Sequence, residues 1–547
     1  MVTGLARAAC HVRSNPIAKA SMTHFDDLSR RALLVSIAAA SGAPLIARAA
    51  AQTDAPPPAA AAPAPFGYPD VVKRARDLAA APFDSAIPPL PDGLANLDFD
   101  HWRDIRFKSD KPLLGQEGAN FRLELFHLGH LYKRPVVVNV LRDGIPAPIP
   151  YAANLFDYGH TTLGVLPVNL GFAGLRLKFP INAPHVWDEV IAFLGTSYFR
   201  FLGRGQRYGL SARGLVIGAA PRVNEEFPFF REFWIETPDA MAEHIVIYAL
   251  LDGESATGAF RFDVNPGQET FIDANVTLFA RKATPELGLA PLSSMYFVGK
   301  ADRRLADDFR GELHDSDGLL MHTGAGEWIW RPLSNPVKPS VSVFLDANPR
   351  GYGLLQRDRN FSDYEDLDLA YELRPSYWIE PHEGWGDGRV ELTELPTSDE
   401  TNDNIVVAWT PKQGLEVGKP LAYGYRITAM SMDQSLTPGG RTVATFRVAP
   451  RALGAPESPP PGATRFLIDF SGGDLSYYMS DPSLVETVAT ASAGRILRTF
   501  LTPNTHIRGF RAGVDVAVDA GQSADLRVFL RAGPKALTET WTFPWRS

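Results

Sequence analysis

From Phe66 onward the chain is divided into short runs in which apolar and polar residues alternate, and turn residues separate these runs. Clear examples are residues 121–126, 244–251, 258–264 and 341–345. Alternation with a period of two, enriched in β-branched and aromatic residues, is typical of a half-buried β-strand. Glycine (46 residues) and proline (45 residues) are too frequent for a mainly helical protein. The pattern therefore predicts a mainly β protein, a large antiparallel β-sandwich with few helices.

Two segments depart from this strand pattern and favour helices. Residues 68–81 place charged side chains on one face of a helix and Val, Ala and Leu on the other. Residues 182–194 also suggest partial helix. We expect both to be minor parts of a β protein.

Composition divides the mature part of the chain into two domains. A segment rich in Gly and Pro spans residues 431–458, and we interpret it as a linker. It follows a large β-sandwich domain at residues 66–430, which we expect to carry the functional surface. The strand-like runs of residues 459–547 fit one small immunoglobulin-like β-sandwich.

The N-terminal segment has the order of features expected of a twin-arginine export signal. Arg30 and Arg31 precede an apolar run at residues 35–47, and an Ala-Arg-Ala motif ends at Ala49. We predict a signal peptide at residues 1–49, a Pro/Ala-rich spacer at residues 50–65 and a periplasmic protein. Translation from Met22 would give the signal an ordinary length. A transmembrane anchor is the alternative, but the apolar run is shorter than the roughly 20 residues that a span needs.

Charge and motif content exclude several classes of protein. The formal net charge of −8 argues against a nucleic-acid-binding protein, which would need a basic surface. The single cysteine, Cys10, cannot form an internal disulfide or a cysteine zinc site. Residues 203–209 deviate by one position from a dinucleotide-binding glycine motif, and no P-loop, zinc-protease or serine-hydrolase motif occurs. We therefore expect no cofactor and no metal.

A calcium site is the alternative for one acidic segment. Oxygen ligands from several carboxylates suit this ion. The series lacks the spacing of an EF-hand loop, and it consists of Asp358, Asp363, Glu365, Asp366 and Asp368.

The stretch from residue 302 to residue 409 combines carboxylates with Trp, Tyr, Arg and Asn, which is the combination that sugar chemistry needs. Aromatic faces pack on pyranose rings, while Arg and carboxylates bind hydroxyl groups. Two carboxyl groups in different environments can act as general acid and base at a glycosidic bond. The alternatives are that acidic loops are solvated turns and that the Trp residues form core. With the arginine-bearing loop at 203–209, the predicted substrate-binding residues are Trp328, Trp330, Arg331, Arg350, Tyr352, Arg357, Arg359, Trp378, Trp385, Arg204 and Arg207.

These motifs resemble the MdoG/OpgG/OpgD family of periplasmic glucan biosynthesis proteins, and the resemblance covers residues 66–547. The twin-arginine signal is similar to that of the D-type members. The matching stretches are residues 97–107, 193–200, 203–214, 230–234, 314–319, 326–332, 348–359, 375–378 and 400–406.

The resemblance implies a fold, a substrate and a set of catalytic residues. The fold would be a β-sandwich similar to galactose mutarotase, followed by an immunoglobulin-like domain. The substrate would be β-1,2-glucan, which some members hydrolyse with inversion and others convert to a cyclic product by transglycosylation. By motif, Asp403 matches the general acid, Asp315 matches the base, and Tyr371 would relay a proton.

The sequence leaves other functions open. The same aromatic and arginine residues would suit a non-catalytic glucan-binding protein that presents or sizes the backbone for a membrane glucan synthase. A third possibility is a structural sandwich whose C-terminal domain docks a partner. The choice between hydrolysis and transfer, and between a monomer and a homodimer, stays open at this point.

Overall fold

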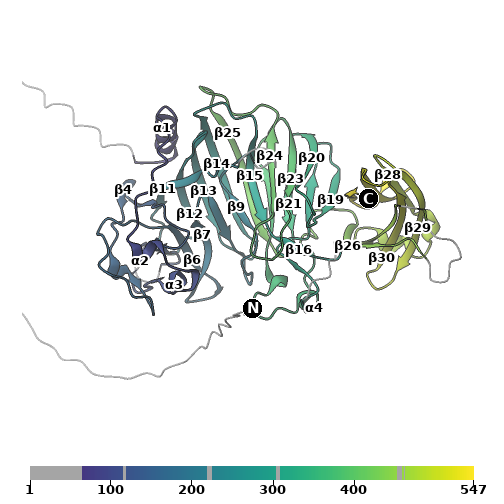
Figure 1. Ribbon diagram of the computed structural model, residues 1–547, viewed down its shortest axis with the longest axis horizontal. Helices are drawn as coiled ribbons and strands as arrows, with labels where there is room; N and C mark the ends of the chain where they lie inside the picture. The colour runs from purple at the N-terminus through teal and green to yellow at the C-terminus, as the bar shows by residue number, and fades with distance from the viewer. Residues whose placement is uncertain are drawn as a thin grey trace, which may run out of the picture. The chain divides into compact units, whose positions relative to one another are not determined.

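The computed structural model describes residues 65–111, 113–114, 119–218, 225–302, 308–451, 459–460 and 462–546. These residues form a mainly β protein, as the alternating pattern predicts (Figure 1). The four example runs all lie in strands: β2 (Arg122–Phe126), β12 (Ile245–Asp252), β13 (Ala256–Asn265) and β20 (Ser340–Ala347). The predicted export signal and nearly all of the predicted spacer, residues 1–64, lie outside the described residues.

Within the described residues, one sheet of the sandwich has ten strands. Its neighbours pair antiparallel, and β10 (Val216–Ile217) pairs with β15 beside the main path. The order is β2, β6 (Gly174–Ala183), β7 (Val186–Leu194), β8 (Tyr198–Phe201), β9 (Ser211–Arg213), β15 (Leu287–Ser294), β24 (Ile405–Pro411), β23 (Asp387–Glu394) and β20.

The second sheet has fifteen strands and continues into the C-terminal part of the chain. A parallel pairing of β19 with β33 joins the two parts, and β32 (Lys535–Ala536) pairs with β31 at the side. The order is β28 (Glu486–Ala491), β31 (Ser523–Ala532), β33 (Thr540–Arg546), β19 (Trp328–Pro332), β18 (Gly318–His322), β21 (Gly351–Leu355), β22 (Ser376–Pro381), β25 (Leu421–Met430), β14 (Thr270–Ala280), β13, β12, β11 (Phe229–Glu236), β3 (Val137–Arg142) and β4 (Ile145–Pro148).

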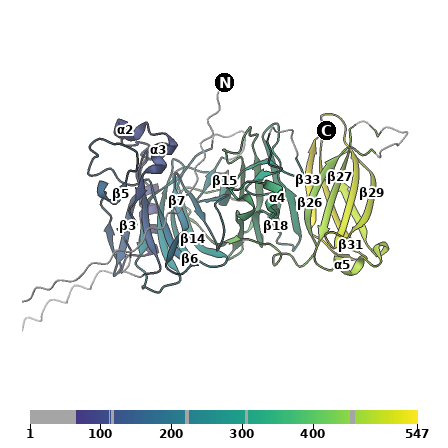
Figure 2. The ribbon, with the colours of Figure 1, turned by 90° about the horizontal axis from the view of Figure 1, so that it is seen from below.

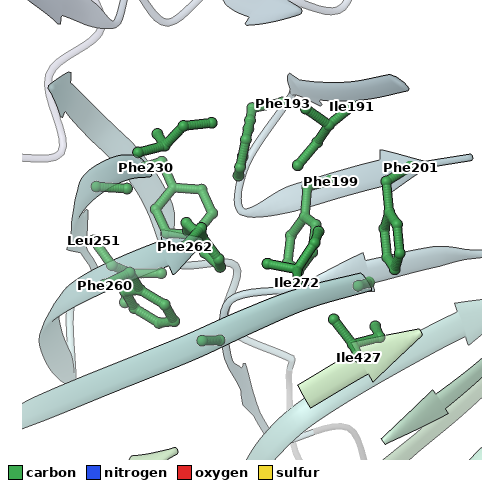
Figure 3. Close-up of a cluster of buried hydrophobic side chains, with 14 of the residues drawn as sticks. Ile191, Phe193, Phe199, Phe201, Phe230, Leu251, Phe260, Phe262, Ile272 and Ile427 are labelled. Carbon is green, nitrogen blue, oxygen red and sulfur yellow. The ribbon is translucent and has the colours of Figure 1, made fainter. Parts of the chain in front are cut away.

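A shared hydrophobic core holds the two sheets face to face. Phe193 and Phe199 of the ten-stranded sheet pack on Phe262 of the fifteen-stranded sheet, with ring centroids 5.4 and 5.3 Å apart (Figure 3). All three side chains are at most 1% exposed. Burial on this scale is the main driving force for the sandwich, and it makes a rigid scaffold for the loops at the strand ends.

The helices are few and short. The first predicted helix is confirmed as α1 (Tyr68–Ala79), which packs Val71 and Ala75 on the outer side of β12–β14. The second prediction is wrong, because residues 186–194 form β7, which pairs with β6 and β8. The remaining helical turns are α2 (Asp92–Ala95), α3 (Phe99–Asp104), η1 (Ala153–Leu155), α4 (Phe361–Tyr364), η2 (Tyr371–Leu373), α5 (Leu475–Tyr478) and η3 (Pro482–Leu484).

Two small two-stranded sheets lie beside the sandwich. They pair β1 (Arg106–Phe107) with β5 (Phe156–Asp157), and β16 (Tyr296–Val298) with β17 (Leu313–His314). The second of these sheets lies next to the loops that carry the predicted catalytic residues. Among the described residues, no helix is long and apolar enough to cross a membrane.

The C-terminal part adds a four-stranded sheet, in the order β26 (Arg441–Val448), β27 (Ala463–Ser471), β30 (Gly509–Ala517) and β29 (Arg495–Asn504) (Figure 2). Its strands and β28, β31 and β33 enclose a second core. Strand β26 lies inside the segment that we interpreted as a linker. Residues 441–448 therefore belong to the C-terminal sheet.

Arg357, which follows β21, links the large sandwich to these C-terminal strands. Its guanidinium donates to both carboxylate oxygens of Glu539 at 2.7 and 3.1 Å and to Asp433 at 2.7 Å. The Arg357 side chain is only 5% exposed and lies over the Trp330 ring at 3.6 Å. Removing one partner of such a buried ion pair leaves an uncompensated charge and lowers the stability of the protein.

We predict that Arg357→Met lowers the stability of the protein by about 3–5 kcal/mol, because it leaves the Glu539 carboxylate buried without its cation. Thermal and urea unfolding would measure the change. The double variant Arg357→Met/Glu539→Gln should recover part of the loss. The exposed Arg350 offers a control, for which Arg350→Ala should stay within about 0.5 kcal/mol. Equal stability of Arg357→Met and wild type would contradict this role.

Candidate active site

Asp315 lies directly after β17, in a loop that is fixed by its backbone. The Asp315 N–H donates to the Met295 carbonyl at 2.8 Å. Asp315 is 5% exposed, and its carboxylate forms an ion pair with Arg374. The predicted base is thus a buried carboxylate paired with the Arg374 cation.

Asp403 lies at the end of the loop between β23 and β24. Its neighbour Asn404 is buried, and the Asn404 amide pairs with both backbone groups of Tyr296 at 2.8 and 3.0 Å. The same amide donates to the Leu395 carbonyl at 2.9 Å. Asp403 itself keeps 29% of its side chain exposed, and Arg200 lies 4.0 Å from its carboxylate. The predicted acid is therefore accessible from solvent on an anchored loop.

The loops of Asp315 and Asp403 are therefore anchored on consecutive residues, Met295 and Tyr296. These carboxylates are far apart in sequence, and one short backbone segment between β15 and β17 brings their loops together. Buried backbone polar groups need partners, so this arrangement is strongly constrained.

Tyr371 begins the single turn η2, and its side chain is 1% exposed. The hydroxyl donates to Glu400 at 2.8 Å, and the Arg374 guanidinium lies 3.6 Å above the ring centroid. Burial and the bond to Glu400 raise the pKa of Tyr371. The Tyr371 hydroxyl therefore stays protonated at neutral pH and can donate.

Arg374 connects these groups. Burial, together with the charges of Arg200 and Arg310, lowers the pKa of Arg374 to about 10 despite the opposing charge of Glu400. Arg374 is still a cation at neutral pH, so it can compensate the buried Asp315 carboxylate. Glu400 has its own cation, because Arg310 lies 2.8 Å from its carboxylate.

A second buried charge cluster lies behind the Asp315 loop. The ligand atoms of Glu312, His314 and Asp358 lie within 4.8 Å of one another, a spacing that would suit a metal ion. The Lys300 ammonium already contacts Asp358 at 2.7 Å and Glu312 at 3.2 Å. The Lys300 ammonium therefore compensates the negative charge of Glu312 and Asp358.

Several predicted substrate-binding residues are enclosed by protein. Arg331 pairs with Glu394 at 2.7 Å, and Tyr352 donates to the Ala290 carbonyl at 2.8 Å. The side chains are at most 5% exposed. The structure therefore assigns to packing and internal ion pairs the residues Trp330, Arg331, Tyr352, Arg357 and Trp378.

The other predicted binding residues keep accessible surface. Arg204, Arg207 and Arg350 are exposed, while Trp328, Trp385 and Arg359 are partly buried. Two of the six contact η2: the backbone N–H of Arg207 donates to the Leu373 carbonyl at 3.0 Å, and the Arg359 guanidinium donates to the Glu372 carbonyl at 3.1 Å. A cavity of about 360 Å³ lies beside η2, lined by residues that include Gln206, Arg359, Leu373, Met432 and Arg441.

Sequence reasoning did not assign Arg374, Glu400, Arg310 or Asn404 to the site. Arg374 follows Tyr371 by three residues, the spacing that brings side chains together on a 3₁₀ turn. Asn404 follows Asp403 directly, but its partner Tyr296 is 108 residues away. Only the first of these relations leaves a local signal in the sequence.

Comparison with known proteins gives one family and a set of relatives. The family model described as "Periplasmic glucan biosynthesis protein, MdoG" matches residues 66–545. The chain is 45% identical over 486 residues to glucans biosynthesis protein G of Ralstonia nicotianae, covering 87% of this chain and 95% of that protein. It is 42% identical over 488 residues to glucans biosynthesis protein D of Xanthomonas campestris pv. campestris, covering 88% and 91%. Relatives of both types match, so assignment to the D type remains a prediction.

Among solved structures, a galactose mutarotase related enzyme from Lactobacillus acidophilus matches with a TM-score of 0.22 and 10% identity. The match covers 48% of this chain and 91% of that chain.

We predict that Asn404→Ala destabilises the protein by about 1–3 kcal/mol, because it leaves the buried N–H and carbonyl of Tyr296 without partners. Thermal unfolding would measure the change. Asn402→Ala is the matched control: Asn402 is exposed in the same loop, and its change should stay within about 0.5 kcal/mol. If the two variants were equally stable, Asn404 would not anchor the loop.

Proposed function

The chain belongs to the MdoG family of periplasmic glucan biosynthesis proteins, and from this premise we propose that it shapes a β-1,2-linked glucose backbone by endo-acting cleavage. The observation that carries the proposal is the anchoring of the Asp315 and Asp403 loops on consecutive residues, Met295 and Tyr296. A fixed pair of carboxyl groups in different environments is what glycosidic cleavage requires.

The environments of the two carboxyl groups support distinct roles. Asp403 is partly exposed on an anchored loop, so it is assigned as the general acid that protonates the leaving oxygen. Asp315 is buried and pairs with the Arg374 cation, which favours the ionised form needed in a general base. Inversion would follow if a water or a sugar hydroxyl attacks from the side opposite to Asp403.

Tyr371 is assigned as the group that passes a proton toward the base. Its hydroxyl is protonated and buried, and Arg374 contacts both its ring and the Asp315 carboxylate. A relay lets acid and base lie farther apart than direct attack by water allows. In the absence of substrate the hydroxyl donates to Glu400, so the relay needs this bond to exchange for one to the attacking molecule.

The accessible arginines and the neighbouring cavity support binding of a glucan chain. Arg207 is exposed beside η2, and a guanidinium can bind a pair of sugar hydroxyls. The Arg359 guanidinium already donates to the Glu372 carbonyl and to Ser376, so it shapes this edge of the site from within the protein. The cavity volume of about 360 Å³ lies within the range of ligand sites. Hydrolysis and cyclising transglycosylation use the same acid and base, and differ in whether water or a hydroxyl of the glucan attacks.

Three further assignments are part of the proposal. Residues 1–49 act as a twin-arginine signal that delivers the protein to the periplasm, consistent with the description of the family. Residues 66–430 form the catalytic domain. The residues from 459 onward form an immunoglobulin-like domain, to which strand β26 adds residues 441–448.

We predict that Asp403→Asn lowers the rate of β-1,2-glucan cleavage by about 10²- to 10⁴-fold, the usual contribution of a general acid. Assays of product formation and of glucan binding would be made on the same preparations. Binding and thermal stability should be unchanged, since the side chain is partly exposed and isosteric.

Asp399→Asn is the matched control in the same loop. It removes a charge but keeps the oxygen that accepts from the Thr401 N–H, so cleavage should continue. Full activity of Asp403→Asn would refute the assignment of the acid. Glucan binding by the wild type without any turnover would instead support a protein that presents the backbone to a membrane glucan synthase.

A further inference from the structure

His314, the residue before Asp315, is fully buried, and both of its ring nitrogens face oxygen atoms. Nε2 lies 2.8 Å from a carboxylate oxygen of Glu312, and Nδ1 lies 2.8 Å from the side-chain oxygen of Gln356. A neutral imidazole has one N–H, so it can satisfy only one of these acceptors.

The orientation of the Gln356 amide follows from its other contacts. Its Nε2 donates to the carbonyls of His314 and Tyr371 at 3.0 and 3.4 Å, which leaves the amide oxygen to face His314 Nδ1. Nδ1 must therefore carry a proton. A flipped amide would set its N–H₂ group against the imidazole and its oxygen against two carbonyls.

Glu312 is ionised, so Nε2 of His314 must also donate. The second carboxylate oxygen of Glu312 lies 3.2 Å from the Lys300 ammonium. Burial pushes the pKa of Glu312 upward, but the bond from His314 and the charge of Lys300 outweigh it and hold the pKa below its usual value. Both nitrogens of His314 thus act as donors.

Aromatic rings enclose the imidazole on two sides. Tyr296 stacks on it with centroids 5.4 Å apart and planes 11° apart, and Tyr364 contacts it edge-on at 5.4 Å. A π face favours a cation at such a distance. Tyr364 in turn stacks on Tyr371 at 5.6 Å.

We propose that His314 is a buried imidazolium at neutral pH that positions the candidate base Asp315 and the turn carrying Tyr371. This role rests on the proposed function. Its protons bind the Glu312 carboxylate and the Gln356 amide, and Gln356 joins the backbone of the Asp315 loop to that of Tyr371. Loss of the Nδ1 proton would free Gln356 and loosen both attachments.

Electrostatics supports this arrangement. Burial opposes the charge, but the hydrogen bond and charge of Glu312, with the charges of Asp317 and Asp358, hold the pKa of His314 above its ordinary value of 6.5. Because the pKa of His314 is raised in the folded protein, protonated His314 stabilises the fold fully below about pH 6.5. This contribution is lost as the pH rises through the pKa of His314 in the folded protein. The titratable and charged groups that face or surround His314 are Glu312, Tyr296, Lys300, Asp317, Arg357, Asp358, Tyr364 and Asp363.

The direct test is the protonation state of His314 in the whole protein. Long-range ¹H–¹⁵N spectra of ¹⁵N-histidine protein would be compared between wild type and His314→Gln, and the missing signals belong to His314. At pH 7.5 we expect both nitrogens of His314 to be protonated. One unprotonated ring nitrogen at pH 7.5 would overturn the proposal, whether or not the protein cleaves glucan.

The positioning role is tested by the pH profile of glucan cleavage. We expect the wild-type kcat to fall at alkaline pH with the midpoint seen for His314. Glu312→Gln should move that midpoint to lower pH, because it removes the carboxylate that stabilises the imidazolium. Asp358 has a pKa raised to about 7 by burial and by Asp317 and Glu312, so Asp358→Asn separates its titration from that of His314.

His314→Gln should lower kcat by about 10²-fold, the cost of displacing a catalytic group by about 1 Å, with KM unchanged and the alkaline limb abolished. His322→Gln is the control, because His322 stacks on Trp328 away from these groups and should leave the profile unchanged. An alkaline midpoint that is the same in wild type and Glu312→Gln would overturn the positioning role. That measurement remains decisive if His314→Gln fails to fold.

Discussion

The backbone of Met295 and Tyr296 is the attachment on which the candidate site depends. The Met295 carbonyl accepts from the N–H of Asp315, and both backbone groups of Tyr296 pair with the side chain of Asn404. Because buried backbone groups must be paired, neither loop can shift without leaving polar atoms unsatisfied. Two carboxylates that are far apart in sequence are therefore held by a segment that the sandwich core already fixes. The Asn404 amide thus bonds both backbone groups of Tyr296, as a neighbouring strand would.

Buried charge organises the surroundings of this segment. Asp317 accepts from the N–H groups of Arg357 and Asp358, while the Arg357 side chain binds Glu539 of the C-terminal strands. The loop that carries Asp315 is thus connected to the contact between the large sandwich and the C-terminal sheet. Such networks are costly to break when only one partner is removed. The C-terminal strands consequently support the loop that carries Asp315, and Arg441 of β26 also lines the cavity beside η2.

The sequence predicted the elements well where local pattern decides the structure. Alternation identified strands such as β12 and β20, and charge on one face identified α1. It failed at residues 182–194, where partial helix is expected but pairing with neighbouring strands holds the segment in β6 and β7. For the site, residue type indicates chemistry without indicating exposure, and the predicted binding residues Trp378 and Arg331 are buried. Asn404 acts on Tyr296, which is 108 residues away, and such a contact leaves no local trace in the sequence.

Cleavage of a β-1,2-glucan chain is the activity proposed for this site. It would be seen in a mass spectrum of the products that the mature protein forms from linear β-1,2-glucan. We expect shorter chains, each carrying one added water if water attacks, or products at the anhydro mass if a hydroxyl of the glucan attacks. Asp403→Asn should give neither. Unchanged substrate with the wild-type protein would contradict the claim and would favour a protein that binds the glucan without cleaving it.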